Sequence, residues 1–141
     1  MNVASGILLV EDDPEDQSIF EDAIQSLKSR EPVMIRKNGI EAIEILSSLH
    51  LSGTLPCIIL ADLNMPKMSG SEMLRLIKAD ERFKSIPVIV YSTSINKIEK
   101  ENCLRLGAHA YITKPLTYKE SIEVAEMVLR LCRTIRDTIN I

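Results

Sequence analysis

Five short apolar runs, separated by stretches with helical spacing, constrain the fold of this chain more than any other feature. Their sequences are GILLV (6–10), VMI (33–35), CIILA (57–61), PVIVY (87–91) and HAYIT (109–113). The runs do not alternate with polar residues, and continuous runs of this kind are typical of parallel strands that are covered on both faces. Each run therefore predicts a buried strand.

Apolar residues recur at helical spacing after every run, weakly over residues 95–106 and as a long stripe over 118–138. This fivefold alternation predicts an α/β fold, a flavodoxin-like, doubly wound (βα)5 sandwich with a five-stranded parallel sheet in the order 2-1-3-4-5. Asp13 is expected to cap the first helix, with Pro14 at its first position and Asp16 at the capping-box position.

The length and composition indicate a single globular domain. The chain has 141 residues, of which 45% are hydrophobic and 26% charged, and its net charge is −3. No segment concentrates Lys and Arg, so we expect no nucleic-acid partner. The N-terminus lacks the features of a signal peptide, and no apolar stretch approaches the length of a membrane span. We therefore expect one domain over residues 1–141, with no output domain, in the cytoplasm.

The chain has three cysteines, Cys57, Cys103 and Cys132, which are far apart in the sequence. Their spacing matches no zinc or redox motif. We expect all three to be buried thiols in a reducing compartment.

Polar residues follow the predicted strands at the points where each strand ends. Glu11 and Asp12 follow the first strand, Asp62 follows the third, Ser92 follows the fourth, and Lys114 follows the fifth. In a doubly wound sheet these ends meet at one edge, where ligands bind. Because the first and third strands are neighbours in the expected order, the three carboxylates are expected to lie close together.

Three carboxylates in one crevice repel one another unless a cation lies among them. Oxygen ligands from carboxylates, a backbone carbonyl and water are typical of Mg²⁺ sites. Lys114 adds a fixed positive charge, and Ser92 adds a small hydroxyl donor. An acidic metal pocket with one ammonium and one hydroxyl can hold a phosphoryl group on one of its own carboxylates.

Four motif blocks carry a resemblance to response-regulator receiver domains. The blocks are LLVEDD (8–13), LADLNMP (60–66), VYSTS (90–94) and YITKP (111–115), and their order and spacing resemble the family over almost the entire chain. The segment DLNMPKMSG and the long loop before the third strand look most like the stand-alone receivers typified by phytochrome response regulators. The resemblance implies a phosphorylation-dependent switch of a two-component phosphorelay.

The resemblance assigns roles to the residues around the acidic pocket. It implies that Asp62 is the phosphoacceptor and one of the Mg²⁺ ligands. Asp12 would bind the ion directly, whereas Glu11 would bind it mainly through water. Asn64 would supply its backbone carbonyl to the same ion. Asp13 belongs to the first motif block but is interpreted as a helix cap rather than as a ligand.

The resemblance also implies roles for residues at the ends of the last two strands. Lys114 would pair with the phosphoryl group, Ser92 would be the switch hydroxyl, and Tyr111 would be the switch aromatic. Receiver domains usually have a cis peptide bond after this lysine, so a cis Lys114–Pro115 bond is expected. Ser92 replaces the commoner Thr, and Leu116 stands where Phe is frequent, but neither departure removes a required atom.

The expected phosphoryl donor is the phosphohistidine of a sensor histidine kinase or of a histidine phosphotransfer protein, with Mg²⁺ as the cofactor. The chain would assist its own phosphorylation and slow dephosphorylation without being a turnover enzyme. Two alternatives stay open. One is a protein-binding module with the receiver fold that does not depend on phosphorylation. The other is an aspartyl-nucleophile phosphatase, although Asn64 stands where such enzymes have a second aspartate.

The last predicted helix has more apolar surface than one sheet face needs. Five residues share the face expected to lie on the sheet: Ile122, Ala125, Leu129, Cys132 and Ile139. Five more widen that face beyond the stripe of a typical surface helix: Val124, Met127, Val128, Leu131 and Ile135. We therefore expect a symmetric homodimer through this helix, with the fourth helix at the same interface.

Overall fold

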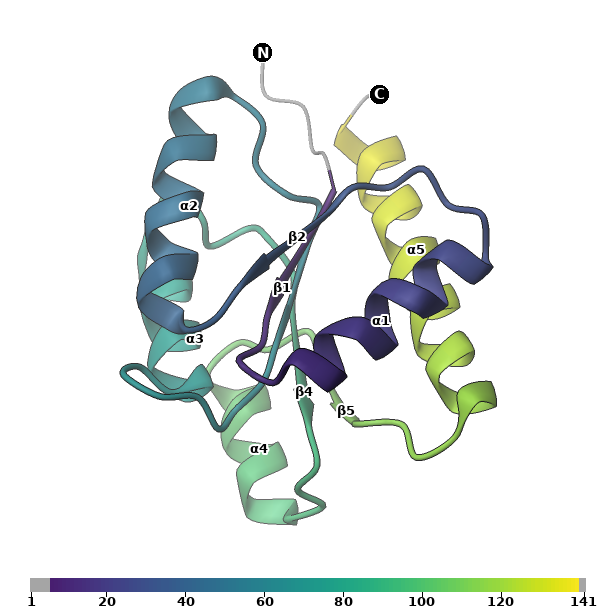
Figure 1. The fold of residues 1–141 in the computed structure, drawn as a ribbon. Helices are drawn as coiled ribbons and strands as arrows, with labels where there is room; N and C mark the ends of the chain where they lie inside the picture. Colours follow the sequence, from purple (N-terminus) through teal and green to yellow (C-terminus); the bar gives the residue numbers. More distant parts are fainter. Residues whose placement is uncertain (1–5, 140–141) are drawn as a thin grey trace.

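The computed structural model describes residues 6–139 and shows a parallel sheet with helices on both faces (Figure 1). Its strands are β1 Ile7–Val10, β2 Val33–Arg36, β3 Ile58–Ala61, β4 Val88–Ser92 and β5 Ala110–Thr113. Their order is β2-β1-β3-β4-β5, and every neighbouring pair is parallel. The predicted fold class and strand order are therefore confirmed.

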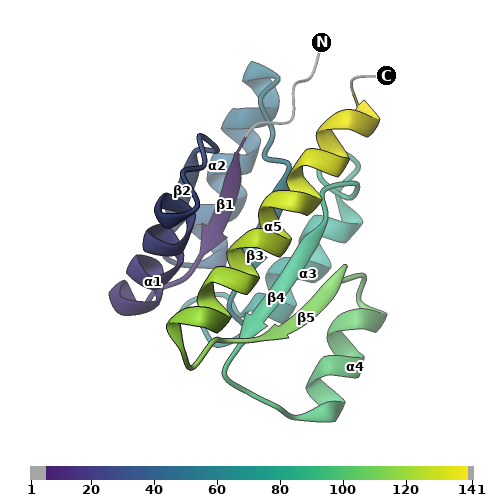
Figure 2. The ribbon, with the colours of Figure 1, turned by 90° about the vertical axis from the view of Figure 1, so that its right-hand side faces the viewer.

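The helices are α1 Pro14–Ser26, α2 Gly39–Ser52, α3 Gly70–Ala79, α4 Lys97–Arg105 and α5 Tyr118–Ile139. Helices α1 and α5 cover one face of the sheet, and α2, α3 and α4 cover the other (Figures 1 and 2). The first four helices begin at capping side chains, which accept hydrogen bonds from backbone N–H groups of the first turn: Asp13, Asn38, Ser69 and Asn96. Within residues 6–139, no helix combines the length and the apolar character needed to cross a bilayer.

Two apolar cores lie on the two faces of the sheet. Strands β1, β3 and β4 are buried along their whole length. Leu8 and Ile59 belong to the core beneath α2, α3 and α4, whereas the next residues along each strand, Leu9 and Leu60, belong to the core beneath α1 and α5. Successive side chains of a strand point to opposite faces, so burial on both faces explains these three apolar runs. The edge strands β2 and β5 are only partly buried, so the expectation of a buried strand is wrong for them.

Helix α5 contributes a broad apolar face to the second core. Ala125, Leu129 and Cys132 are buried as expected, and Val128 is fully buried with them, so Val128 belongs to the core rather than to the outer part of the face. Five more residues are partly buried against the same core: Ile122, Val124, Met127, Leu131 and Ile135. The side chain of Ile139, which was expected on this face, lies outside the described part of the structure.

A disulfide joins Cys57 to Cys132 across this core, although the two cysteines are 75 residues apart in the sequence. The expectation of three free thiols is therefore wrong for this pair. Within the described residues, Cys103 is the free cysteine, and it is buried. The contact forms because Cys57 directly precedes β3 and α5 packs against that strand. No local spacing in the sequence reveals such a contact.

Candidate functional site

Acidic side chains meet at the edge of the sheet where β1 and β3 end. Glu11 and Asp12 follow β1, and Asp62 follows β3. The two strands are paired, and the Asp62 N–H donates a hydrogen bond to the Val10 carbonyl at 3.0 Å. This pairing brings carboxylate oxygens of Glu11, Asp12 and Asp62 within 4.8 Å of one another. The strand order therefore produces the acidic cluster.

The Lys114 ammonium lies among these carboxylates at the end of β5. Its Nζ atom is 2.6 Å from Glu11 Oε1, 2.7 Å from Asp16 Oδ2 and 3.5 Å from Asp62 Oδ2. The side chain of Lys114 is 8% exposed and that of Glu11 is 1% exposed. Charges buried to this extent are screened only weakly by salt. Without the Lys114 ammonium, the buried carboxylates of Glu11 and Asp62 would lack a counter-charge.

Burial and neighbouring charges shift the protonation of the site. Burial raises the pKa of Glu11 to about 7, and the charge of Asp62 adds to the rise, while the hydrogen bond from Lys114 opposes it. Burial also raises the pKa of Asp62, against the opposing effect of the Lys114 charge. Burial alone would lower the pKa of Lys114, but hydrogen bonds to Asp16 and Glu11 raise it above its usual value. Lys114 is therefore a permanent cation.

Asp16 is a site residue that the sequence reasoning missed, and its capping-box assignment is wrong. Asp13 does cap α1, because its Oδ1 accepts a hydrogen bond from the Glu15 N–H at 2.9 Å. The backbone N–H of Asp13, however, donates to Glu11 Oε2 at 3.2 Å instead of to Asp16. The Asp16 carboxylate pairs with Lys114. The available signal was its place in the first turn of α1, the helix that follows β1.

The loop between β3 and α3 positions Asp62. The Asn64 N–H donates to Asp62 Oδ1 at 3.4 Å, and the Gly70 N–H donates to the Leu63 carbonyl at 3.0 Å. A Cβ atom at position 70 would collide with the backbone oxygen of Asp62. Glycine at this position therefore allows α3 to begin directly against the site.

The β4–α4 loop links the two residues expected to form the switch, Ser92 and Tyr111. Ser92 is fully buried, and its Oγ accepts a hydrogen bond from the Ser94 N–H at 3.1 Å. Tyr111 is half-buried and donates its hydroxyl to the Ser94 carbonyl at 2.9 Å. The Lys114 N–H donates to the Ser92 carbonyl at 2.8 Å. The side chains of Ser92 and Tyr111 therefore both bond to the backbone of Ser94.

The expected cis bond between Lys114 and Pro115 is not found, since every peptide bond within residues 6–139 is trans. The prediction of a cis bond is wrong, so backbone geometry at Pro115 gives no support for the expected position of the Lys114 side chain. The distances from Nζ to the three carboxylates locate the ammonium directly. The long, flexible side chain of lysine reaches them without the sharper backbone turn of a cis bond.

The donor set of this site fits Mg²⁺. Glu11, Asp12 and Asp62 offer hard carboxylate oxygens close enough together to share one ion. Asp12 is solvent-exposed, so this side of the cluster has room for the water molecules that Mg²⁺ retains.

Known proteins resemble the chain in both sequence and fold. Residues 7–126 match the family model of the response regulator receiver domain. The chemotaxis protein CheY1 of Helicobacter pylori is 32% identical over 123 residues, which cover 87% of this chain and 95% of CheY1. The phosphorylated cyanobacterial phytochrome response regulator RcpA is 32% identical with a TM-score of 0.80, covering 89% of this chain and 91% of RcpA. The Mn²⁺-bound response regulator Rcp1 is 29% identical with a TM-score of 0.77, and the match covers 88% of this chain and 91% of Rcp1.

The chain belongs to the response regulator receiver domains, the phosphorylation-dependent switches of two-component signalling. The expected likeness to phytochrome response regulators is confirmed. Receiver domains act as signalling switches rather than as turnover enzymes.

Proposed function

We propose that Asp62 accepts a phosphoryl group from the phosphohistidine of a sensor histidine kinase or a histidine phosphotransfer protein. In this proposal the chain works in the cytoplasm as a single receiver domain. The observation that carries the proposal is the surroundings of the Asp62 carboxylate. Lys114 Nζ lies 3.5 Å from Asp62 Oδ2, and Glu11 and Asp12 lie beside it. A phosphoryl group on Asp62 would therefore meet a fixed cation on one side and a metal-binding cluster on the other.

The transfer would be a direct displacement at phosphorus. One oxygen of Asp62 forms the new bond as the bond from phosphorus to the histidine nitrogen breaks, and the imidazole leaves with that electron pair. The Lys114 ammonium balances charge on the phosphoryl oxygens. Ser92 can donate its hydroxyl proton to one of them while its Oγ still accepts from the Ser94 N–H. Water attack on the same phosphorus would give the slow dephosphorylation.

Mg²⁺ bound at this cluster would offset the negative charge that gathers around the phosphoryl group. We assign direct coordination to Asp12 and Asp62, a contact through water to Glu11, and the backbone carbonyl of Asn64 as a further ligand. Ser92 and Tyr111 are the proposed switch residues, because both already bond to Ser94 in the β4–α4 loop.

Titration with beryllofluoride, a phosphoryl mimic, in the presence of Mg²⁺ tests this proposal. We expect one saturable binding event by calorimetry and chemical-shift changes at Asp62, Ser92 and Tyr111 by NMR. Asp62→Asn should abolish both responses. Asp13→Asn is the matched control and should respond normally, because Asn also caps helices well. An unresponsive wild-type protein would overturn the proposal and favour the phosphorylation-independent binding module.

We further propose that the partner docks beside the site, on apolar side chains of α1 and the β5–α5 loop. Ile19 is 41% exposed, Leu116 90% and Tyr118 68%. Ile19 and Leu116 line the same hollow of about 310 Å³. Ile19 lies one helical turn beyond Asp16, and Leu116 lies two residues after Lys114. A partner helix seated here would hold its phosphohistidine next to Asp62.

We also propose a symmetric homodimer through α5. A hollow of about 280 Å³ lies between β5 and α5 and is lined partly by Met127 and Leu131. On the neighbouring α4, Ile98 is 68% exposed and Leu104 is 42% exposed. A second copy would cover this apolar surface.

A further inference from the structure

The cysteine pair lies at the opposite end of β3 from Asp62. Cys57 precedes β3, and Cys132 lies in the C-terminal half of α5. Their Cα atoms are 5.4 Å apart, which is near the commonest separation for disulfides. Cys57 is 1% exposed and Cys132 is fully buried. The disulfide therefore fastens the last helix to the central strand that carries the candidate phosphoacceptor.

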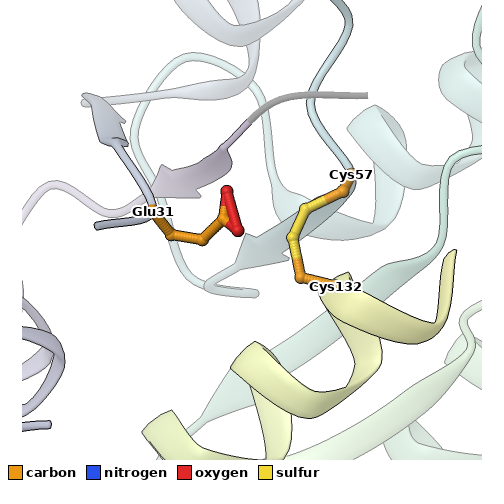
Figure 3. Close-up of side chains that lie close together, drawn as sticks. All are labelled: Glu31, Cys57 and Cys132. Carbon is orange, nitrogen blue, oxygen red and sulfur yellow. A yellow bond between two sulfur atoms is a disulfide. The ribbon is translucent and has the colours of Figure 1, made fainter. Parts of the chain in front are cut away.

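An ion pair fastens the same part of α5. Arg136, one helical turn after Cys132, places its Nη2 atom 2.6 Å from Glu31 Oε1. Glu31 lies in the segment between α1 and β2, and its carboxylate faces the two sulfur atoms (Figure 3). A carboxylate oxygen and both sulfurs lie within 4.8 Å of one another. The disulfide and the Glu31–Arg136 ion pair thus hold the same part of α5.

We propose that Cys57 and Cys132 form a reversible thiol–disulfide site that controls how firmly α5 is held. In oxidation, the two thiols lose two electrons and two protons and form the disulfide. A small-molecule disulfide of the glutathione type takes them up and becomes two thiols. Reduction runs in reverse with two small-molecule thiols. Disulfides of this kind in reducing compartments are usually transient or redox-sensing.

Burial makes the exchange depend on a movement of α5. A thiolate must reach a sulfur along the sulfur–sulfur axis, and neither sulfur is accessible while α5 lies on the sheet. The C-terminal half of α5 must therefore open before either reaction. The Glu31–Arg136 ion pair opposes that opening, because it ties the same half of the helix to the α1–β2 segment. The ion pair thus slows the redox reaction.

A metal ion held by the same three side chains is the competing interpretation. Glu31 and the two sulfurs could in principle supply three ligands. The two sulfurs are bonded to each other, and the Glu31 oxygen is engaged by the positive charge of Arg136, which repels a cation. These contacts favour the disulfide.

Thiol counting on the whole protein tests the pairing without any mutation. Protein equilibrated with oxidised glutathione and then denatured should show one reactive thiol, that of Cys103, and protein reduced beforehand should show three. The oxidised form should melt roughly 10 °C higher than the reduced form. Cys103→Ala should keep this difference, and Cys132→Ala should abolish it. Three reactive thiols after treatment with oxidised glutathione would overturn the proposal, as would stoichiometric Zn²⁺ uptake in place of the disulfide.

Reduction kinetics test the opening step. The rate of reduction of the native protein should reach a plateau as the dithiothreitol concentration rises, because opening of α5 becomes limiting. Arg136→Gln should raise this plateau roughly fivefold, the effect of losing one ion pair. Arg133→Gln, an exposed neighbour on the same helix, is the control and should leave it unchanged. A rate that rises linearly with dithiothreitol and is equal in all three proteins would show that α5 does not gate the site.

Discussion

Lys114 joins carboxylates from three parts of the chain. Its ammonium contacts Glu11 after β1, Asp16 in α1 and Asp62 after β3. The three acidic groups would repel one another without it. Lys114 therefore has a structural role in addition to its proposed role opposite the phosphoryl group.

Replacement of Lys114 by Met should show this structural role. Without Mg²⁺ at pH 7, Lys114→Met should lower the free energy of unfolding by about 3 kcal/mol, because it leaves buried carboxylates unpaired. Added Mg²⁺ should restore part of the loss by binding the same carboxylates. Urea denaturation measures both effects, with the exposed Lys119→Met as control. Equal stability of Lys114→Met and wild type in metal-free buffer would contradict the described ion pairs.

Glu31 provides a pH-dependent contribution to stability away from the acidic cluster. The hydrogen bond from Arg136 holds the pKa of Glu31 below its usual value of 4.5, although burial opposes the shift. A carboxyl whose pKa is lower in the folded state stabilises the fold above the unfolded-state pKa. This stabilisation is lost as the pH falls through the lower, folded-state pKa. It is therefore fully present at neutral pH and disappears only in acid.

Glu31→Gln should accordingly lower the free energy of unfolding by about 1–2 kcal/mol at pH 7. The difference from wild type should shrink as the pH falls below about 4.5 and vanish once Glu31 is protonated. Denaturant unfolding of the oxidised protein at several pH values measures it. Glu44→Gln, an exposed carboxyl on α2, should show no such pattern. A constant difference between Glu31→Gln and wild type at all pH values would argue against the ion pair.

At the scale of elements, α5 has two sides with different tasks. Ala125, Val128 and Cys132 are fully buried against the sheet. Met127 and Leu131 are only partly buried and line the hollow beside β5. The first set holds the fold together, and the second is the surface that we assign to the homodimer.

Charges on this second surface should prevent dimerisation without unfolding the protein. Sedimentation at micromolar concentration should give a dimer for wild type and a monomer for Met127→Glu plus Leu131→Glu. Leu76→Glu, at a 48% exposed position on α3, is the control and should remain dimeric. A wild-type monomer, both with and without beryllofluoride, would rule out the dimer.

The elements were predictable because each depends on local pattern. Continuous apolar runs predicted all five strands, and strand ends predicted where Glu11, Asp12 and Asp62 would meet. Asp16 was missed because a carboxylate at this position can either complete a capping box or pair with Lys114. The direction of the side chain decides between the two, and sequence spacing does not determine that direction. The Cys57–Cys132 contact depends on how α5 crosses β3, and no local pattern in the sequence records that crossing.

At the scale of the whole molecule, proposed functions lie at both ends of β3. The acidic cluster and the apolar side chains around Ile19 and Leu116 lie at the end that carries Asp62. The disulfide and the Glu31–Arg136 ion pair lie at the other end. Partner docking and attachment of the C-terminal half of α5 therefore involve different residues.

A double variant should separate partner docking from phosphorylation chemistry. Ile19→Ser plus Leu116→Ser should slow transfer from a phosphorylated histidine phosphotransfer protein by roughly tenfold or more, because apolar contacts to the partner are lost. Phosphorylation by acetyl phosphate, which needs no docking surface, should keep its wild-type rate. Leu51→Ser, at an 88% exposed position in α2, is the control and should affect neither reaction. Equal slowing with both donors would show that these residues act in phosphoryl transfer itself and not in partner docking.

Mapping of the phosphoryl group tests the role of Asp62 most directly. The protein is incubated with acetyl phosphate and Mg²⁺, the acyl phosphate is trapped by borohydride reduction, and the modified peptide is identified by mass spectrometry. We expect one modified residue, Asp62, in wild type, and no modification in Asp62→Asn or after removal of Mg²⁺ with a chelator. A phosphoryl group on another residue of wild type, or undiminished labelling of Asp62→Asn, would contradict the assignment of Asp62 as the phosphoacceptor.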